Sequence, residues 1–431
     1  MIKYKNFDPV TLTLFIITLL FLIFHHPIID NDSPGYIKGE LIRQPLDHLF
    51  IALFNWSKQY QLYCVMWTQS ILTFFSLCYA RNWLKKNLGL TDFSIFPALL
   101  FVLISICFYY QMTHIDSEGI AFPLFIFSFF NLLDCFFEQS YWKIIVSSIL
   151  VGALILTRTQ FYFLYAILLA IIFWYVLKKF PIKYTLTSLI IFIASMISTT
   201  ILDHTYHYFK NGYFVTEPFS GILTVVQPLY LSQSNSAQYF NNKFEKIYVQ
   251  SLLDTISKKN INYEVKSHNL NSMKSYQYAY QEYSENYNTI LQLACSSYSN
   301  QPCQSTLGLS PPTLISMNAL TSHISKILFL HNIQNNILLF VYKVINSIGN
   351  IGFFGFVIFL FFSVLFSILK NNRSNRNIEK IFVFVSLIVI ISNAAVIAAA
   401  EPTLPEYTCY SQFLLYCLAA FFSEKVYTGQ K

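Results

Sequence analysis

The chain has 431 residues, of which 55% are hydrophobic and only 11% are charged, and its mean hydropathy is +0.48. A soluble globular domain carries roughly 25% charged residues, so the composition excludes an ordinary soluble protein. The net charge of +7 does not indicate nucleic-acid binding, because the basic residues are distributed as topology signals of a membrane protein. We therefore predict an all-α, polytopic membrane protein whose partner is the lipid bilayer and which binds no nucleic acid.

The apolar residues form about ten runs long enough for transmembrane helices. No cleavable signal peptide is evident, so we interpret the first run as a retained helix. The stretch 142–177 is interpreted as two short spans joined at 157–160, with one long tilted helix as the alternative. The predicted spans are 9–28, 62–80, 94–112, 119–137, 142–157, 160–177, 184–202, 348–369, 380–400 and 406–422.

Three domains follow from these spans. Residues 1–202 form an N-terminal transmembrane core of about seven helices, 203–335 form a small extracytoplasmic domain, and 336–431 contain the C-terminal transmembrane helices. Within the middle segment, Lys243–Lys258 and Ser275–Leu293 have the apolar spacing of amphipathic helices. Residues 319–345 are predicted to form another helix, lying along the membrane interface.

The short loops on one side of this topology carry most of the lysines and arginines, which is typical of the cytoplasmic side. Both termini are then cytoplasmic, and any active site on the acidic loops faces outward. The outward side carries the loop after the first span, the 111–118 turn, the segment 203–335 and the 401–406 turn. All the acidic candidate residues lie on this side, where neither ATP nor nucleotide sugars are available.

The first outward loop contains Asp30 and Asp32 directly after the first span. Carboxylates at a membrane edge lose hydration and are often functional. Asp32 is the candidate general base, because a carboxylate in a partly dry cleft can take a proton from a hydroxyl. Asp30 is a supporting charge or an alternate base. The structural alternative is that Asp32 and Ser33 cap the following helix.

The second outward loop contains His114, Asp116 and Glu118. These residue types within five positions suit a divalent cation, Mg²⁺ or Mn²⁺, which is the one cofactor that the sequence suggests. The alternative is that the acidic residues stabilise the first turn of the next helix by interacting with its dipole.

Two arginines are candidate phosphate ligands, because the planar guanidinium group matches phosphate oxygens. Arg158 lies among apolar residues, where a cation usually has a partner. Its structural alternative is a salt bridge to one of the outward acids. Arg43 is the second candidate.

Two cysteines, Cys295 and Cys303, belong to the extracytoplasmic segment. In an oxidising compartment we expect them to form a disulfide. The chain has no glycine-rich phosphate loop, no nucleophile elbow and no Cys-x-x-Cys metal pattern, which argues against nucleotide-driven pumps and ordinary hydrolases.

The motifs together resemble the GT-C class of polytopic glycosyltransferases, which includes protein O-mannosyltransferases and the aminoarabinose transferases of lipid A. The likeness covers the first 225 residues. Its motifs are Asp32-Ser33-Pro34-Gly35-Tyr36, the Arg-x-Pro-Leu stretch Arg43–Leu46, Asp116-Ser117-Glu118, the hairpin ending Leu156-Thr157-Arg158-Thr159-Gln160, and Asn211–Phe214 followed by Gly221. Ser33 departs from the many members that have glutamate there.

The resemblance implies transfer of a sugar from a polyprenyl-phosphate carrier to a hydroxyl of an envelope glycan, lipid or protein, with inversion. In this scheme Asp32 deprotonates the acceptor. Arg158, Arg43 and Tyr36 bind the donor phosphate, and Asp116 and Glu118 form the second acidic motif. A lipopolysaccharide component is one such acceptor. The resemblance also implies a bacterial inner (plasma) membrane protein whose active site faces the periplasm or exterior.

Two rival functions remain open: an O-antigen-type polymerase and a non-enzymatic flippase or transporter of lipid-linked sugars. The polymerase would depend on basic outward loops, which are scarce here. A transporter would have polar residues near mid-span and paired repeats, and we find few of the former and none of the latter.

Overall fold

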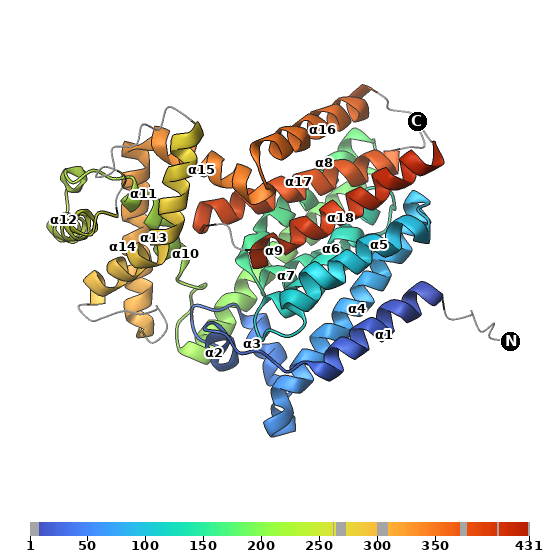
Figure 1. Cartoon of the computed structure of the whole chain (residues 1–431), viewed down its shortest axis with the longest axis horizontal. Coiled ribbons are helices and arrows are strands. Elements are labelled where there is room, and N and C mark those ends of the chain that lie inside the picture. The colour runs from blue at the N-terminus through green and yellow to red at the C-terminus, as the bar shows by residue number, and fades with distance from the viewer. Residues whose placement is uncertain are drawn as a thin grey trace. The chain divides into compact units, whose positions relative to one another are not determined.

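The structure is a computed structural model and describes residues 8–261, 263, 273–299, 309–370, 377–402 and 405–429. Over these residues the chain is helical and forms no β-strand, which confirms the predicted all-α class (Figure 1). Two compact units are present. The membrane unit comprises Met1–Lys210, Gly355–Asn393 and Pro405–Lys431, and the insert unit comprises Asn211–Phe354 and Ala394–Leu404.

A helix covers each of the ten predicted spans. The membrane unit contains α1 (Pro9–Phe24), α2 (Ser33–Lys38), α3 (Pro45–Ala52), η1 (Asn55–Tyr60), α4 (Gln61–Leu88), α5 (Asp92–Val102), η2 (Leu103–Gln111), α6 (Glu118–Cys135), α7 (Tyr141–Ile155), η3 (Thr159–Tyr162), α8 (Phe163–Leu177), α9 (Ile182–Asn211), most of α16 (Ile351–Lys370) and α17 (Asn377–Ala400), and α18 (Pro405–Thr428).

Among the described residues, seven helices are long and apolar enough to cross a membrane: α4 with η1, α5 with η2, α6, α8 with η3, α9, α16 and α17. Two more, α1 and α7, are apolar but shorter. Such helices are typical of an integral membrane protein. In hydrocarbon there is no water to bond to the backbone N–H and C=O groups, and an α-helix pairs these groups within the same segment.

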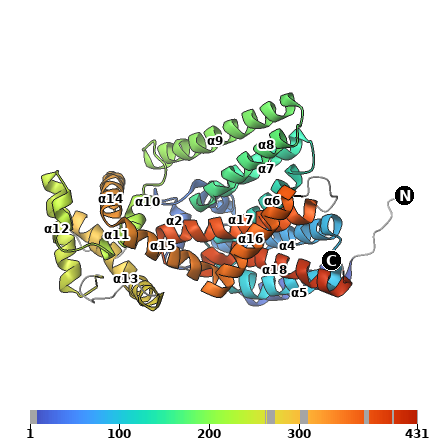
Figure 2. The same ribbon diagram turned by 90° about the horizontal axis from the view of Figure 1, so that it is seen from above.

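The 142–177 stretch forms two helices, α7 and α8, so the alternative of one long helix is wrong. The chain between them leaves helical geometry at Arg158, whose backbone is extended (φ −153°, ψ 119°). Figure 2 shows α7, α8 and α9 running alongside one another in the membrane unit.

The helices differ in how much of their surface is covered by protein. In α6, 83% of the 18-residue apolar stretch is buried inside the protein, whereas in α16 only 6% of the corresponding stretch is buried. The aromatic residues of α6, including Phe122, Phe125, Phe129 and Phe130, are fully buried. We conclude that α6 is the central helix of the membrane unit, and its N-terminus carries Glu118.

The insert unit is built from α10 (Ser220–Thr224), α11 (Val226–Tyr230), η4 (Ser236–Tyr239), α12 (Lys243–Lys258), α13 (Met273–Ser299), α14 (Pro311–His331) and α15 (Ile333–Ile348). The helix α12 matches the predicted amphipathic segment, and its buried residues, such as Val249, Leu252 and Ile256, lie on one face. The single helix predicted over 319–345 is wrong, because Asn332 takes a non-helical conformation (φ −126°, ψ 45°) and separates α14 from α15.

Candidate functional site

Two loops at one end of the membrane unit are held together by backbone pairing. The N–H of Ile28 donates to the carbonyl of Thr113 (2.9 Å), and the N–H of Ile115 donates to the carbonyl of Ile28 (3.1 Å). This bridge ties the segment after α1 to the segment after η2. It therefore brings the first acidic loop beside the second, although about 80 residues separate them in sequence.

Asp30, and not Asp32, organises the start of α2. Its Oδ1 accepts the N–H groups of Asp32 (2.8 Å) and Ser33 (2.9 Å) and the hydroxyl of Ser33 (3.0 Å). Asp32 makes no capping bond with its side chain, so the alternative that it caps the helix is wrong. Burial alone would raise the pKa of Asp30, but hydrogen bonds from His114, Ser33 and Asp32 outweigh it and hold that pKa well below its usual range.

Arg43 connects Asp32 to the second loop. One guanidinium nitrogen lies 2.7 Å from Asp32 Oδ1, and the other donates to the Tyr36 hydroxyl at 3.2 Å. The Tyr36 hydroxyl is in turn 3.0 Å from the hydroxyl of Ser117. Asp32 remains 53% exposed, so its carboxylate is accessible from outside while Arg43 fixes its position.

Arg158 closes the network from the α7–η3 turn. It forms an ion pair with Glu118, as the structural alternative for this arginine predicted, and its guanidinium lies over the Tyr407 ring at 4.4 Å. The other oxygen of Glu118 accepts the Ser117 hydroxyl (3.1 Å), and the Glu118 N–H donates to Asp116 Oδ1 (3.0 Å). Asp32, Asp116 and Arg158 therefore belong to one network of contacts.

Three side chains of this end are arranged as cation ligands: Asp30, His114 and Asp116, whose ligand atoms lie within 4.8 Å of one another. The sequence predicted a set of Asp116, Glu118 and His114. Glu118 is not part of this group because it pairs with Arg158, and Asp30 takes its place. Burial raises the pKa of Asp116 to about 7, against a hydrogen bond from Tyr110, and its Oδ2 is buried. A nearby cation would stabilise the charge on that oxygen.

Asp47 was missed by the sequence reasoning. It lies on α3, is only 2% exposed, and neither of its carboxylate oxygens accepts a hydrogen bond from another described residue. Burial raises its pKa well above the usual range, and the charges of Arg158, Asp116 and Arg43 act on it. Asp47 stands in the first turn of α3. An acidic residue is favourable there for any helix, so nothing in the sequence indicated a function for it.

The sequence also provided no indication of a role for Gln69, because a single glutamine inside a predicted span has no distinctive pattern around it. Its Nε2 lies 3.2, 3.1 and 2.9 Å from the carbonyl oxygens of Gln111, Met112 and His114. A Cβ on Gly119 would lie 2.5 Å from Gln69 Oε1, so a larger residue there would displace the Gln69 amide. Gln69 thus fixes the path of the chain that carries His114 and Asp116.

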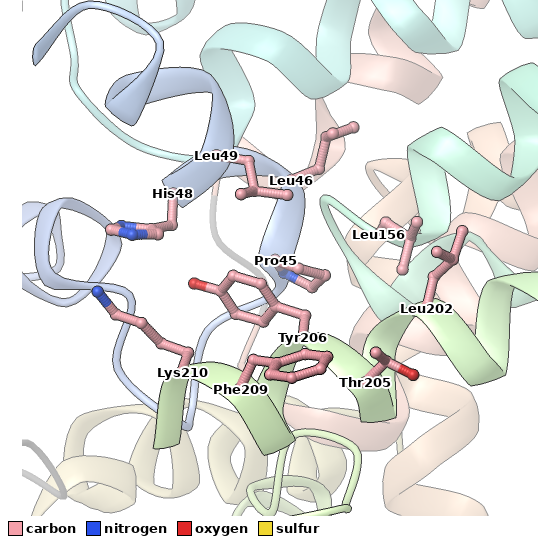
Figure 3. Close-up of a pocket in the computed structure, with 10 residues that line it drawn as sticks. All are labelled: Pro45, Leu46, His48, Leu49, Leu156, Leu202, Thr205, Tyr206, Phe209 and Lys210. Carbon is pink, nitrogen blue, oxygen red and sulfur yellow. The ribbon is translucent and has the colours of Figure 1, made fainter. Parts of the chain in front are cut away.

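A cavity of about 600 Å³ borders α3 and is shown in Figure 3. Its walls come from α3, the end of α7 and the last turns of α9. The lining residues are Pro45, Leu46, His48, Leu49, Leu156, Leu202, Thr205, Tyr206, Phe209 and Lys210. The N–H of Leu46 donates to the carbonyl of Leu156 (3.0 Å) and joins two of these walls.

Of the two cysteines predicted to form a disulfide, Cys295 belongs to the insert unit. Cys295 is buried in α13 and forms a disulfide. Cys303 lies outside the described residues, so its role as the partner stays a prediction. The eight other predicted site residues, in contrast, all lie in the one network of the membrane unit described above.

Comparisons with models of protein families, with curated proteins and with solved structures found no match to this chain. The interpretation of the site therefore depends on its own geometry.

Proposed function

We propose that this protein is a membrane glycosyltransferase that moves a sugar from a polyprenyl-phosphate carrier to a hydroxyl of an envelope glycan, lipid or protein. The ten-span topology, the outward-facing site and the bacterial inner membrane are part of this proposal. So is the likeness to the GT-C class.

One observation carries the proposal. Carboxylates and two arginines from three separate loops meet in one network, which runs from Asp32 through Arg43, Tyr36, Ser117 and Glu118 to Arg158. A reaction that removes a proton at one point and releases a phosphate at another needs both kinds of group within reach of one substrate. Several of these groups are buried, where charge interactions are stronger than in water.

The chemistry divides between the two ends of the network. The Asp32 carboxylate accepts the proton of the acceptor hydroxyl while that oxygen forms a bond to the anomeric carbon. The bond from this carbon to the phosphate oxygen breaks, and its electron pair leaves with the lipid phosphate. Attack and departure on opposite faces of the sugar invert the configuration, through a transition state with oxocarbenium character.

The leaving phosphate requires positive charge and needs no strong acid. Arg158 supplies a guanidinium group at the end of the network opposite Asp32. Arg43, which pairs with Asp32, supplies a second one between the two ends, and its Nε is buried without a hydrogen-bond partner in the described chain. Asp30, His114 and Asp116 are the residues that would hold a divalent cation. Such a cation would add charge stabilisation to the same phosphate.

The decisive experiment is Asp32→Asn in a host from which the native gene has been deleted, with the surface glycan followed by mass spectrometry. We expect sugar addition to fall by about 10²–10⁴-fold, the usual contribution of a general base. Asp92→Asn is the matched control, because Asp92 also pairs with an arginine, Arg81, but at a distant helix end; it should keep activity.

Two results would contradict the proposal at different levels. Full sugar addition by Asp32→Asn at normal expression would refute the assignment of the base. An unchanged envelope glycan and glycolipid profile after deletion of the whole gene would refute the glycosyltransferase function itself.

A further inference from the structure

The cavity beside α3 has a polar end and an apolar end. Figure 3 shows the His48 ring, the Tyr206 hydroxyl and the Lys210 amine gathered on one side, with Leu156 and Leu202 on the other. A volume of about 600 Å³ falls within the range of small-molecule sites. The ligand that matches this division has an apolar chain and a polar head.

The polar end is prepared for hydrogen bonding. The Tyr206 hydroxyl is buried and has no hydrogen-bond partner among the described residues. The His48 Nδ1 lies 3.1 Å from the carbonyl oxygens of both Tyr36 and Ile37, so this nitrogen carries a proton and the ring orientation is fixed. A buried hydroxyl without a partner is costly, and a ligand group that bonds to it removes that cost.

Gly39 allows the residues at the polar end of the cavity to pack closely. Its φ of +65° suits glycine, and a Cβ there would lie 2.6 Å from the Tyr206 hydroxyl and 2.8 Å from the His48 ring. The close approach of α2, α3 and α9 therefore depends on a missing side chain. The cavity is a built feature of the fold and does not result from loose packing.

The charge at the polar end selects the head group. Lys210 is a cation at the end of α9, and the tyrosine hydroxyl can donate a hydrogen bond, so an anionic head is favoured. The rim residues Leu49, Leu202 and Phe209 are 48%, 57% and 81% exposed. In a protein with membrane-spanning helices, exposed apolar residues of this kind face lipid, which makes a lipid chain the natural occupant.

We propose that this cavity binds an anionic lipid, and that this lipid is the acceptor of the sugar, an assignment that rests on the proposed function. The donor phosphate already has its own cations, Arg158 and Arg43, neither of which lines the cavity. Asp47 lies between the cavity-lining residues Leu46 and His48 in sequence, so α3 contributes to both the cavity and the charged network. A lipid in this cavity would therefore lie against the helix that also carries Asp47 of the charged network.

The test uses the purified full-length protein in phosphatidylcholine vesicles that contain a phosphatidylglycerol probe with a photoreactive acyl chain. Labelled peptides are then mapped by mass spectrometry. We expect labelling of the segments around Leu156 and Leu202. Thr205→Trp, which fills the cavity, should lower this labelling about tenfold, equivalent to 1.4 kcal/mol of binding.

Two matched controls lie on the same helix. Ile201→Trp adds the same bulk at a residue that is 52% exposed and does not line the cavity. Lys183→Glu reverses a charge near the opposite end of α9, whereas Lys210→Glu reverses it at the polar end. We expect both controls to label as the wild type does. Lys210→Glu should label several-fold less, and a phosphatidylcholine probe should be insensitive to it.

Equal labelling of Thr205→Trp and Ile201→Trp, with unchanged thermal stability, would overturn the lipid site. If equimolar polyprenyl phosphate abolished the labelling, the cavity would be the binding site of the donor lipid, and the acceptor assignment would be overturned. Labelling in the expected pattern by a protein that never removes sugar from its donor would refute the proposed function and leave the lipid site in place.

Discussion

Charged groups are buried in both units, but their surroundings differ. In the insert unit, the Lys343 amine is fully buried and lies 3.2 Å from Gln227 Oε1 and 3.3 Å from the Tyr283 hydroxyl. The Gln227 amide continues this network to the carbonyl of Asn336 at 3.0 Å. In the membrane unit, by contrast, the buried carboxylate oxygens of Asp47 accept no hydrogen bond from another described residue.

This difference separates structural burial from functional burial. Buried polar groups are normally paired, because leaving one unpaired costs free energy. A network whose members are paired with one another, as around Lys343, stabilises a particular packing of helices. A group of buried, unpaired atoms next to arginines indicates a site that a ligand completes. The predictions below test that distinction.

Arg158→Ala should have the largest effect. We expect transfer to fall by about 10³-fold or more, because the phosphate loses a guanidinium group. We also expect the protein to lose about 3–5 kcal/mol of stability, because Glu118 becomes a buried charge without its cation. Both are measured on purified protein, by donor turnover and by thermal unfolding.

The double variant Arg158→Ala with Glu118→Gln separates the two effects. It should recover stability, since no buried charge is left unpaired, but it should not recover transfer. Recovery of transfer along with stability would mean that Arg158 has a structural role only, as Lys343 is expected to have.

Gln69→Leu should have an intermediate effect. The substitution keeps the volume but removes the donor to three carbonyl oxygens, so the chain at 111–114 is less well held. Loss of a group that orients metal ligands typically lowers affinity by about 10–100-fold. We expect that decrease in Mn²⁺ affinity, measured by electron paramagnetic resonance, with a parallel decrease in transfer.

Thr73→Val is the control for Gln69→Leu. Thr73 lies one turn further along α4, and its hydroxyl bonds to the Gln69 carbonyl within the helix. It should leave Mn²⁺ affinity unchanged. Wild-type affinity in Gln69→Leu would show that this residue does not position the ligands, and absence of Mn²⁺ binding by the wild type would remove the cation from the proposal.

The sequence was sufficient for features that depend on local pattern. Hydropathy predicted a helix at each of the ten segments, and turn signals with acidic residues predicted the loops that meet at the site. The partners within the site were less predictable. In the candidate cation group, Asp30 takes the place that the sequence predicted for Glu118. This follows from the backbone bridge between Ile28 and His114, a contact across about 80 residues that no local pattern predicts.

Asp47 and Gln69 illustrate the same limit. Each has an ordinary local explanation, as an acidic residue in a helix first turn and as a polar residue within a span. Only tertiary packing shows that one is buried without partners and that the other bonds to three carbonyl groups. The break at Asn332 was missed because apolar residues continue at helical spacing on both sides of it.

Lys343→Met should have the smallest effect on activity and tests the structural side of the comparison. Burial lowers the pKa of Lys343 to about 7, against the opposing charge of Glu401. Between pH 7 and about 10.5 the unfolded chain holds a proton at this lysine that the folded chain does not, so stability rises with pH across this window. Methionine removes the titrating group and keeps an apolar stem of similar length.

The variant should therefore be more stable than the wild type at pH 7, and the difference should shrink as the pH approaches 10. Hydrogen exchange of the α13 and α15 amides at pH 7 and 9.5 measures this stability difference around Lys343. A global unfolding experiment would combine the stabilities of both units and would obscure the difference. Sugar transfer should be unchanged. A loss of transfer with the α13 and α15 amides still protected would place Lys343 among the functional groups, and the distinction between paired and unpaired burial would no longer separate structure from function.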